Sequence, residues 1–197
     1  MLLYNSAVSG NCYKVRLLCA QLGIPLELRE LDVVDRSNRA EVLGHLNPAL
    51  RVPTLILDDG RPLAESNAII TYLAEGTPYL PADRYERAQA LAWMMFEQYE
   101  IEPNLAVARF YRLFGISASP ERLDALQSAG QRGLAALERG LADRAWLVGG
   151  RYSVADISLY AYTHVAAEGG FDLGPYPSVV SWTGRVAAQP GHIEITA

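Results

Sequence analysis

Segments typical of β-strands occur only in the first third of this chain, whereas the rest of its 197 residues has the apolar spacing of α-helices. Helical spacing also separates the strand-like segments, at residues 15–22 and 39–46, and a further short helix follows with Ser66 as its predicted cap. The first 75 or so residues therefore predict the order βαβαββα. The predicted strands lie at residues 2–4, 26–33, 52–57 and 61–64.

A turn-rich segment, residues 76–81 (GTPYLP), separates the two patterns. Beyond it no strand-like segment persists. We therefore expect an α/β domain over residues 1–76, a linker over 77–84 and an all-helical domain over 85–197. A sizeable core is possible, because half of the residues are hydrophobic.

Three local signals mark the helices of the second region. Pro103 should kink or interrupt the first of them, because proline removes a backbone hydrogen bond. Ser153 and Asp156 have the spacing of a capping box, with Asp in place of the usual Glu or Gln. Pro177 fits the first turn of a final helix.

The charge balance makes nucleic acid a poor candidate partner. Seventeen basic residues stand against 22 acidic ones, giving a net charge of −5, and no stripe of Lys or Arg is present. The N-terminus lacks a secretory signal pattern, and no apolar run reaches the roughly 20 residues that cross a bilayer. We expect a cytoplasmic protein with no membrane partner. Cys12 and Cys19 should stay reduced, because seven helical residues separate them by about 10 Å.

The segment Ser9-Gly10-Asn11-Cys12 places a hydroxyl and a thiol where the first strand turns into a helix. A hydroxyl there can donate a hydrogen bond to an anion, and the positive end of the helix favours the same negative charge. The alternative interpretation of Ser9 is an ordinary helix N-cap. No metal site is expected, because the spacing of the three histidines does not build one.

Together with the element order, four motifs resemble the cytosolic glutathione S-transferases, in particular bacterial members of the serine-type (theta, phi and delta-like) classes. The resemblance runs from Leu2 to about Pro190, and it implies a thioredoxin-like α/β N-terminal domain followed by an all-α domain. The motifs are Ser9-Gly10-Asn11 after the first strand, Val52-Pro53 before the third, Glu65-Ser66 after the hairpin, and Ser153 with Asp156 in the helical region.

The resemblance implies a detoxifying transferase. Glutathione would be the cosubstrate, with no prosthetic group, and its thiolate would attack a small, apolar electrophile. Ser9 would stabilise the thiolate as the catalytic hydrogen-bond donor. Relatives form homodimers, and we expect one here.

The remaining glutathione contacts are also implied by the resemblance. Pro53 is expected to follow a cis peptide bond, and the backbone of Val52 would pair with the cysteinyl part. Glu65 would hold the γ-glutamyl ammonium, and Ser66, at a helix start, the γ-glutamyl carboxylate. Arg51 would meet the glycine carboxylate. The alternatives are ordinary helix capping for Glu65 and Ser66 and a solvated surface position for Arg51.

Several alternatives stay open at this point. Asn11 either orients the Ser9 hydroxyl or caps the turn. Tyr4 is the second choice for the thiol's donor and otherwise a core residue. Cys12 aligns with the second cysteine of a Cys-x-x-Cys redox pair, although inert packing is the simpler interpretation. Arg39 is a weaker candidate for the glycine carboxylate.

The site of the electrophile is expected between the two domains, near Tyr99, Arg109, Phe110 and Tyr111, although aromatics at helical spacing are more often core. Two rival functions remain. One is a glutathione-dependent reductase, isomerase or peroxidase on the same fold. The other is a binding protein that has kept the fold without turnover.

Overall fold

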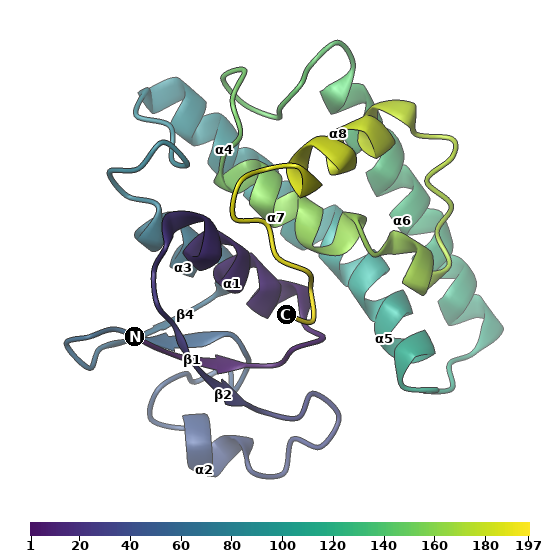
Figure 1. The fold of residues 1–197 in the computed structure, drawn as a ribbon. Helices are drawn as coiled ribbons and strands as arrows, with labels where there is room; N and C mark the ends of the chain where they lie inside the picture. Colours follow the sequence, from purple (N-terminus) through teal and green to yellow (C-terminus); the bar gives the residue numbers. More distant parts are fainter. The chain divides into compact units, whose positions relative to one another are not determined.

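The computed structural model describes all 197 residues, and they form two compact units (Figure 1). The first unit contains Met1–Glu75 together with Pro190–Ala197, and the second contains Gly76–Gln189. The segment 190–197, which we expected in the helical region, thus clusters with the N-terminal unit. No helix combines the length and apolar composition needed to span a membrane.

The first unit is built on a four-stranded sheet with strand order β2-β1-β3-β4. Strand β1 pairs in parallel with β2 and antiparallel with β3, and β3 and β4 form the expected hairpin, so the sheet is mixed. The strands are β1 (Leu2–Asn5), β2 (Glu27–Glu30), β3 (Thr54–Ile56) and β4 (Pro62–Ala64).

Three helices complete the predicted βαβαββα order, which is confirmed: α1 (Gly10–Leu22), α2 (Arg39–Leu43) and α3 (Ser66–Leu73). Helix α1 packs against α3. The predicted cap of α3 is wrong by one residue, because Ser66 is the first helical residue. Glu65 occupies the cap position, and its side chain makes no capping hydrogen bond.

Residues 190–197 cover part of α1. The Tyr13 hydroxyl donates to the carbonyl of Ile193 at 2.7 Å. The guanidinium of Arg16, only 4% exposed, donates to the carbonyls of Ile195 and Ala197. These bonds satisfy polar groups that burial would otherwise leave unpaired.

The second unit is all-helical, as predicted. Pro103 lies within a π-helix, η1, that continues α4 without a break, so the proline interrupts the α-helical hydrogen bonding as expected. Gly133 allows α6 to approach η1 closely, because a Cβ there would lie 2.9 Å from the Glu100 carbonyl oxygen. The helices are α4 (Arg84–Phe96), η1 (Glu97–Ala106), α5 (Val107–Leu113), α6 (Pro120–Leu141), α7 (Val154–Thr163), η2 (Ala166–Gly169) and α8 (Pro177–Ala187).

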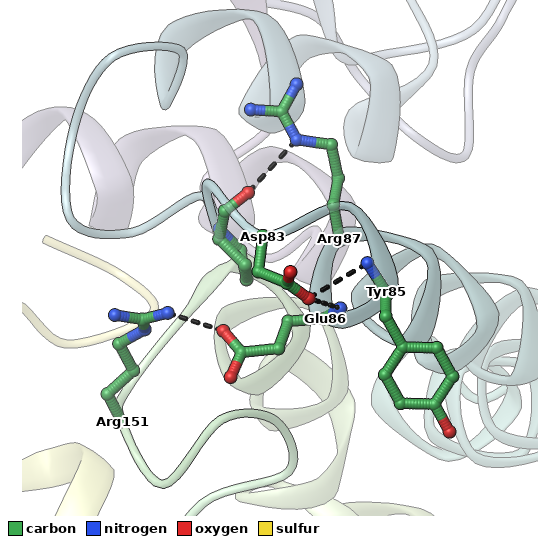
Figure 2. Close-up of polar contacts among 6 residues, drawn as sticks. Asp83, Tyr85, Glu86, Arg87 and Arg151 are labelled. Carbon is green, nitrogen blue, oxygen red and sulfur yellow. Dashed lines mark hydrogen bonds and ion pairs between the residues drawn. The ribbon is translucent and has the colours of Figure 1, made fainter.

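Figure 2 shows the polar contacts that fix the start of α4. The carboxylate of Asp83 caps the helix by accepting from the backbone N–H groups of Tyr85 and Glu86, both at 2.9 Å (Figure 2). Glu86 in turn pairs with Arg151 from the loop before α7. The acidic groups therefore lie at the positive end of the helix, where they stabilise it.

The predicted capping box is confirmed at the start of α7, where the Ser153 side chain accepts from a backbone N–H and Asp156 accepts from the Ser153 N–H at 2.9 Å. Pro177 lies in the first turn of α8, also as predicted. Asp156 further accepts from the indole N–H of Trp182 at 2.9 Å, which ties α7 to α8.

Candidate functional site

The turn between β1 and α1 presents Ser9 at the positive end of a 13-residue helix. Ser9 is the N-cap of α1, with φ −80° and ψ 120°, and its hydroxyl oxygen accepts from the Cys12 N–H at 3.3 Å. The Ser9 N–H donates to the Ser6 carbonyl at 3.0 Å, which closes the turn. Capping uses only a lone pair of the hydroxyl oxygen, so Ser9 keeps its proton for donation, and the Cys12 thiol is one group within its reach.

Two charged side chains, Glu30 and Arg16, hold this turn through the backbone of Ala7. The carboxylate of Glu30 accepts from the side-chain amide of Asn5 and from the Ala7 N–H, the latter at 3.0 Å. The guanidinium of Arg16 donates to the Ala7 carbonyl at 2.9 Å. Neither Glu30 nor Arg16 was expected here, because both contacts depend on tertiary packing that local spacing does not encode.

Cys12 lies in the interior, with none of its surface exposed. Burial raises the pKa of its thiol to about 11, against the smaller effect of its hydrogen bond with Ser9. At neutral pH the thiolate is then only about one part in ten thousand. Burial also raises the pKa of Cys19 to about 12, and both cysteines are free, so the expectation of reduced thiols is confirmed.

The start of α3 lies beside the first turn of α1. The Ser66 hydroxyl donates to the side-chain carbonyl of Asn11 at 3.1 Å, although 55 residues separate the two. Ser66 is buried, whereas Glu65 before it is exposed and has a φ of +68°. A non-glycine residue in that region is strained, which often marks a functional site.

One residue of this cluster was missed. The ammonium of Lys14 donates to Asn11 Oδ1 at 2.9 Å and to Ser66 Oγ at 3.4 Å. A lysine on the buried face of a helix was a usable signal in the sequence, because lysine is rarely buried without a polar partner.

The peptide bond between Val52 and Pro53 is cis, as expected. The backbone before it is held at the Arg51 carbonyl, which accepts from the Asn47 side chain at 3.0 Å and the Thr54 hydroxyl at 2.9 Å. Val52 lies outside the paired residues of β3, and the Arg51 side chain is exposed.

Two of the alternative candidates are structural. The guanidinium of Arg39 is 4% exposed and donates to the carbonyls of Leu50 and Asp32 at 3.1 and 2.7 Å, so it is not available to a carboxylate in solution. Tyr4 packs in the apolar core with Leu43, which supports its interpretation as a core residue.

The residues proposed for an electrophile site lie in the second unit. The side chain of Arg109 is buried and forms an ion pair with Glu168 at 2.6 Å, which links two parts of the second unit. Phe110 packs on Phe114, whereas Tyr99 is 83% exposed. No group of three or more His, Cys, Asp or Glu side chains is arranged as a set of metal ligands.

The first unit thus combines a serine hydroxyl and two adjacent helix N-termini. Backbone N–H groups at helix starts bind anions, and the helix dipoles favour negative charge. The hydrogen bond between Asn11 and Ser66 brings these two helix starts together. Such a site suits a small ligand that carries both a carboxylate and a group that becomes negative during reaction.

Comparison with known proteins identifies the family. The glutathione S-transferase N-terminal domain matches residues 3–79, and the glutathione S-transferase C-terminal domain matches residues 92–190. A glutathione S-transferase from Pseudomonas fluorescens superposes with a TM-score of 0.96 and 42% identity, covering 100% of this chain and 98% of that one.

Two other similar proteins are not named as transferases. The disulfide-bond oxidoreductase YfcG of Escherichia coli is 27% identical over 93% of this chain and 89% of its own length. Ure2p, solved in complex with glutathione, superposes with a TM-score of 0.87 and 25% identity over 96% of this chain and 95% of its own. The two domain matches and the 42% identity together show that this chain belongs to the glutathione S-transferase family.

Proposed function

We propose that the protein is a glutathione S-transferase of the serine type, in which glutathione attacks a small, apolar electrophile through its sulfur. The observation that carries this proposal is the hydrogen bond between Asn11 and Ser66, because it joins the helix start beside Ser9 to a second anion-binding helix start. A tripeptide with a thiol at its centre and carboxylates at its ends would present the thiol to Ser9 and a carboxylate to the start of α3.

Activation of the thiol is the chemical task. A free thiol has a pKa of about 8.5, and lowering it by two units requires about 2.7 kcal/mol. A hydrogen bond to a charged group contributes about 1.5–3 kcal/mol, and a helix N-terminus about 0.3–1 kcal/mol. The Ser9 hydroxyl and the start of α1 can therefore supply the whole shift.

The ligand would be held by residues on both sides of Ser9. The backbone of Val52 would pair with the cysteinyl part, and exposed Arg51 would meet the glycine carboxylate as a charge-assisted partner. The γ-glutamyl end would lie at the start of α3, with its ammonium at Glu65 and its carboxylate at the backbone N–H of Ser66.

Ser9→Ala tests the proposal through the pH dependence of conjugation to an aryl halide. With a bound-thiol pKa near 6.5 in the parent protein and about 8 in the variant, which keeps the contribution of the helix start, kcat/KM for the aryl halide at saturating glutathione and pH 6.5 should fall about 15-fold. Above pH 9 the two values should nearly converge. Cys12→Ala is the matched control and should keep the parent profile. A Ser9→Ala variant with the parent profile, together with an inactive Cys12→Ala, would assign the chemistry to Cys12.

A glutathione-dependent disulfide reductase is the second candidate, because one relative is a disulfide-bond oxidoreductase. Burial and the raised pKa of Cys12 argue that such a reaction would use the glutathione thiol as its nucleophile. The discriminating measurement is reduction of a small disulfide by glutathione with Cys12→Ala. If Cys12→Ala still reduces the disulfide, and does so faster than it conjugates the aryl halide, the second candidate is favoured.

We also propose a cellular compartment and an oligomeric state. Two buried, reduced cysteines suit a reducing compartment, so we place it in the cytoplasm. The resemblance to dimeric relatives, together with the exposed apolar side chains of α4 and η1, supports a homodimer.

A further inference from the structure

Lys14 is the only lysine of a chain that contains sixteen arginines. Its side chain is completely buried on α1. Burying an ammonium costs free energy unless hydrogen bonds replace its hydration, and lysine is among the residues least often buried. A buried lysine in an arginine-rich chain therefore calls for a specific role at its site.

Lys14 completes a triangle with Ser66 of the proposed γ-glutamyl subsite and with Asn11 of the neighbouring helix start. Its ammonium donates to Asn11 Oδ1 at 2.9 Å and to Ser66 Oγ at 3.4 Å, and the Ser66 hydroxyl donates to Asn11 Oδ1 at 3.1 Å. Asn11 comes from the first turn of α1, and Ser66 is the first residue of α3. The three side chains thus connect two helix starts.

The ammonium fixes the direction of every hydrogen bond in this triangle. Lysine has only donors, so it must face the carbonyl end of the Asn11 amide, and the NH₂ group is turned away. For the same reason it must face a lone pair of Ser66, whose proton is then directed to Asn11. Without Lys14 the amide could flip and the hydroxyl could rotate.

We propose that Lys14 is a positioning residue for the γ-glutamyl end of glutathione, acting through Asn11 and Ser66. This inference rests on the proposed function, because it assumes that glutathione is the ligand. Lys14 keeps the start of α3 beside the first turn of α1 and orients the Asn11 amide. These side chains are therefore ordered before glutathione binds, so binding loses less conformational entropy and is tighter.

A double-mutant cycle on glutathione affinity tests this role. Lys14→Met should raise the dissociation constant by about tenfold to hundredfold in the parent protein, the range expected for losing a hydrogen bond from a charged group. In a Ser66→Ala or Asn11→Ala background the same substitution should change the constant less than about threefold. Titration calorimetry with reduced glutathione gives the values.

Arg16→Met is the matched control, because it removes another buried cation two residues further along the same helix. The effect of Arg16→Met on the dissociation constant should add to that of Ser66→Ala. Arg16 bonds to the carbonyls of Ala7 and Ile195 and to no side chain of the triangle. If Lys14→Met is equally additive, or leaves the affinity unchanged, the positioning role is overturned.

A spectroscopic measurement covers the case in which Lys14→Met fails to fold. Because the chain has one lysine, protein labelled with ¹³C at the lysine ε-carbon should give a single resonance from Lys14. Glutathione should shift this resonance in the parent protein, whereas cysteinylglycine, which lacks the γ-glutamyl group, should not. If saturating glutathione leaves the chemical shift of this resonance unchanged, the inference is contradicted. If the parent protein binds no glutathione at all, the proposed function is refuted instead.

Discussion

Asp156 shows how one buried carboxyl group can order several elements. It is completely buried at the start of α7, and its two oxygens accept from the Leu147 N–H, the Ser153 N–H and hydroxyl, and the Trp182 indole. All of these partners are donors, and none is a cation. Burial raises the pKa of this carboxyl group to about 6, although the four hydrogen bonds act in the opposite direction.

Replacing Asp156 with Asn should destabilise the protein by about 2–4 kcal/mol, because one carboxylate oxygen becomes an NH₂ group that faces donors. The loss should also depend on pH. A carboxyl pKa that is higher in the folded state favours folding at low pH, and this contribution is lost as the pH rises through 6. The stability advantage of the parent over Asp156→Asn should therefore shrink by about 2 kcal/mol between pH 4.5 and 7.5.

Urea unfolding of the parent and the variant at several pH values gives this difference. Asp124→Asn, which changes an exposed carboxylate on α6, is the control and should shift stability by less than about 0.5 kcal/mol. A parent advantage that grows as the pH rises would mean that the folded-state pKa of Asp156 lies below its ordinary value.

At the residue scale the sequence was informative where a local motif sets the backbone. Ser9 as a helix cap and the capping box of Ser153 follow from short-range spacing, whereas the cis bond before Pro53 was implied by the family resemblance. The structure contains each of them. Lys14 was missed, and Arg39, a weaker candidate for the glycine carboxylate, is occupied by buried structural contacts. Both environments depend on tertiary packing, as in the contact between Lys14 and Ser66, which local spacing does not encode.

At the scale of elements, α1 is supported by α3 and by the segment 190–197. The segment follows the helix closely, since a Cβ at Gly191 would lie 2.9 Å from the Cα of Gln21. Its bonds to Tyr13 and Arg16 lie on the helix that begins beside Ser9. The segment therefore stabilises the helix start on which the proposed chemistry depends.

Tyr13→Phe should lower the free energy of unfolding by about 1 kcal/mol, because the part-buried Ile193 carbonyl loses its donor and His192 Nε2 loses its contact with the hydroxyl, while the aromatic ring keeps its place. Chemical denaturation measures the change, and amide hydrogen exchange of residues 190–197 should accelerate. Tyr176→Phe is the control, because its hydroxyl donates to the Gln131 carbonyl at an exposed position. Equal losses in the two variants would show that burial of the Tyr13 bond adds nothing.

Element types were more predictable than element ends. Periodicity identified the order βαβαββα, but the strand expected over residues 26–33 is limited to Glu27–Glu30 and the helix over 39–46 to Arg39–Leu43. Ends depend on tertiary contacts and capping, which apolar spacing does not encode. The π-helix Glu97–Ala106 was likewise not foreseen, since a proline signals an interruption without specifying the hydrogen-bonding pattern that replaces the α-helix.

At the scale of the whole molecule, an apolar face remains on α4 and η1. Leu91, Met95 and Tyr99 recur every four residues and are 39%, 65% and 83% exposed. Beside them lies a groove of about 340 Å³, lined by Gln89, Ala92, Trp93 and Phe96. Exposed apolar side chains that continue along one helix face are typical of a surface covered by a partner. We expect the partner to be a second copy of the chain.

The double variant Met95→Glu, Tyr99→Glu should dissociate that homodimer, because burying two unpaired carboxylates costs far more than the apolar contact gains. The parent should sediment at twice the 21.6 kDa of one chain, and the variant should sediment as a monomer, with a dissociation constant raised at least about a hundredfold. Val180→Glu, an exposed apolar position on α8, should leave the dimer intact. A parent that is monomeric at high concentration, or a dimer that only Val180→Glu breaks, would show that the face on α4 and η1 is not the interface.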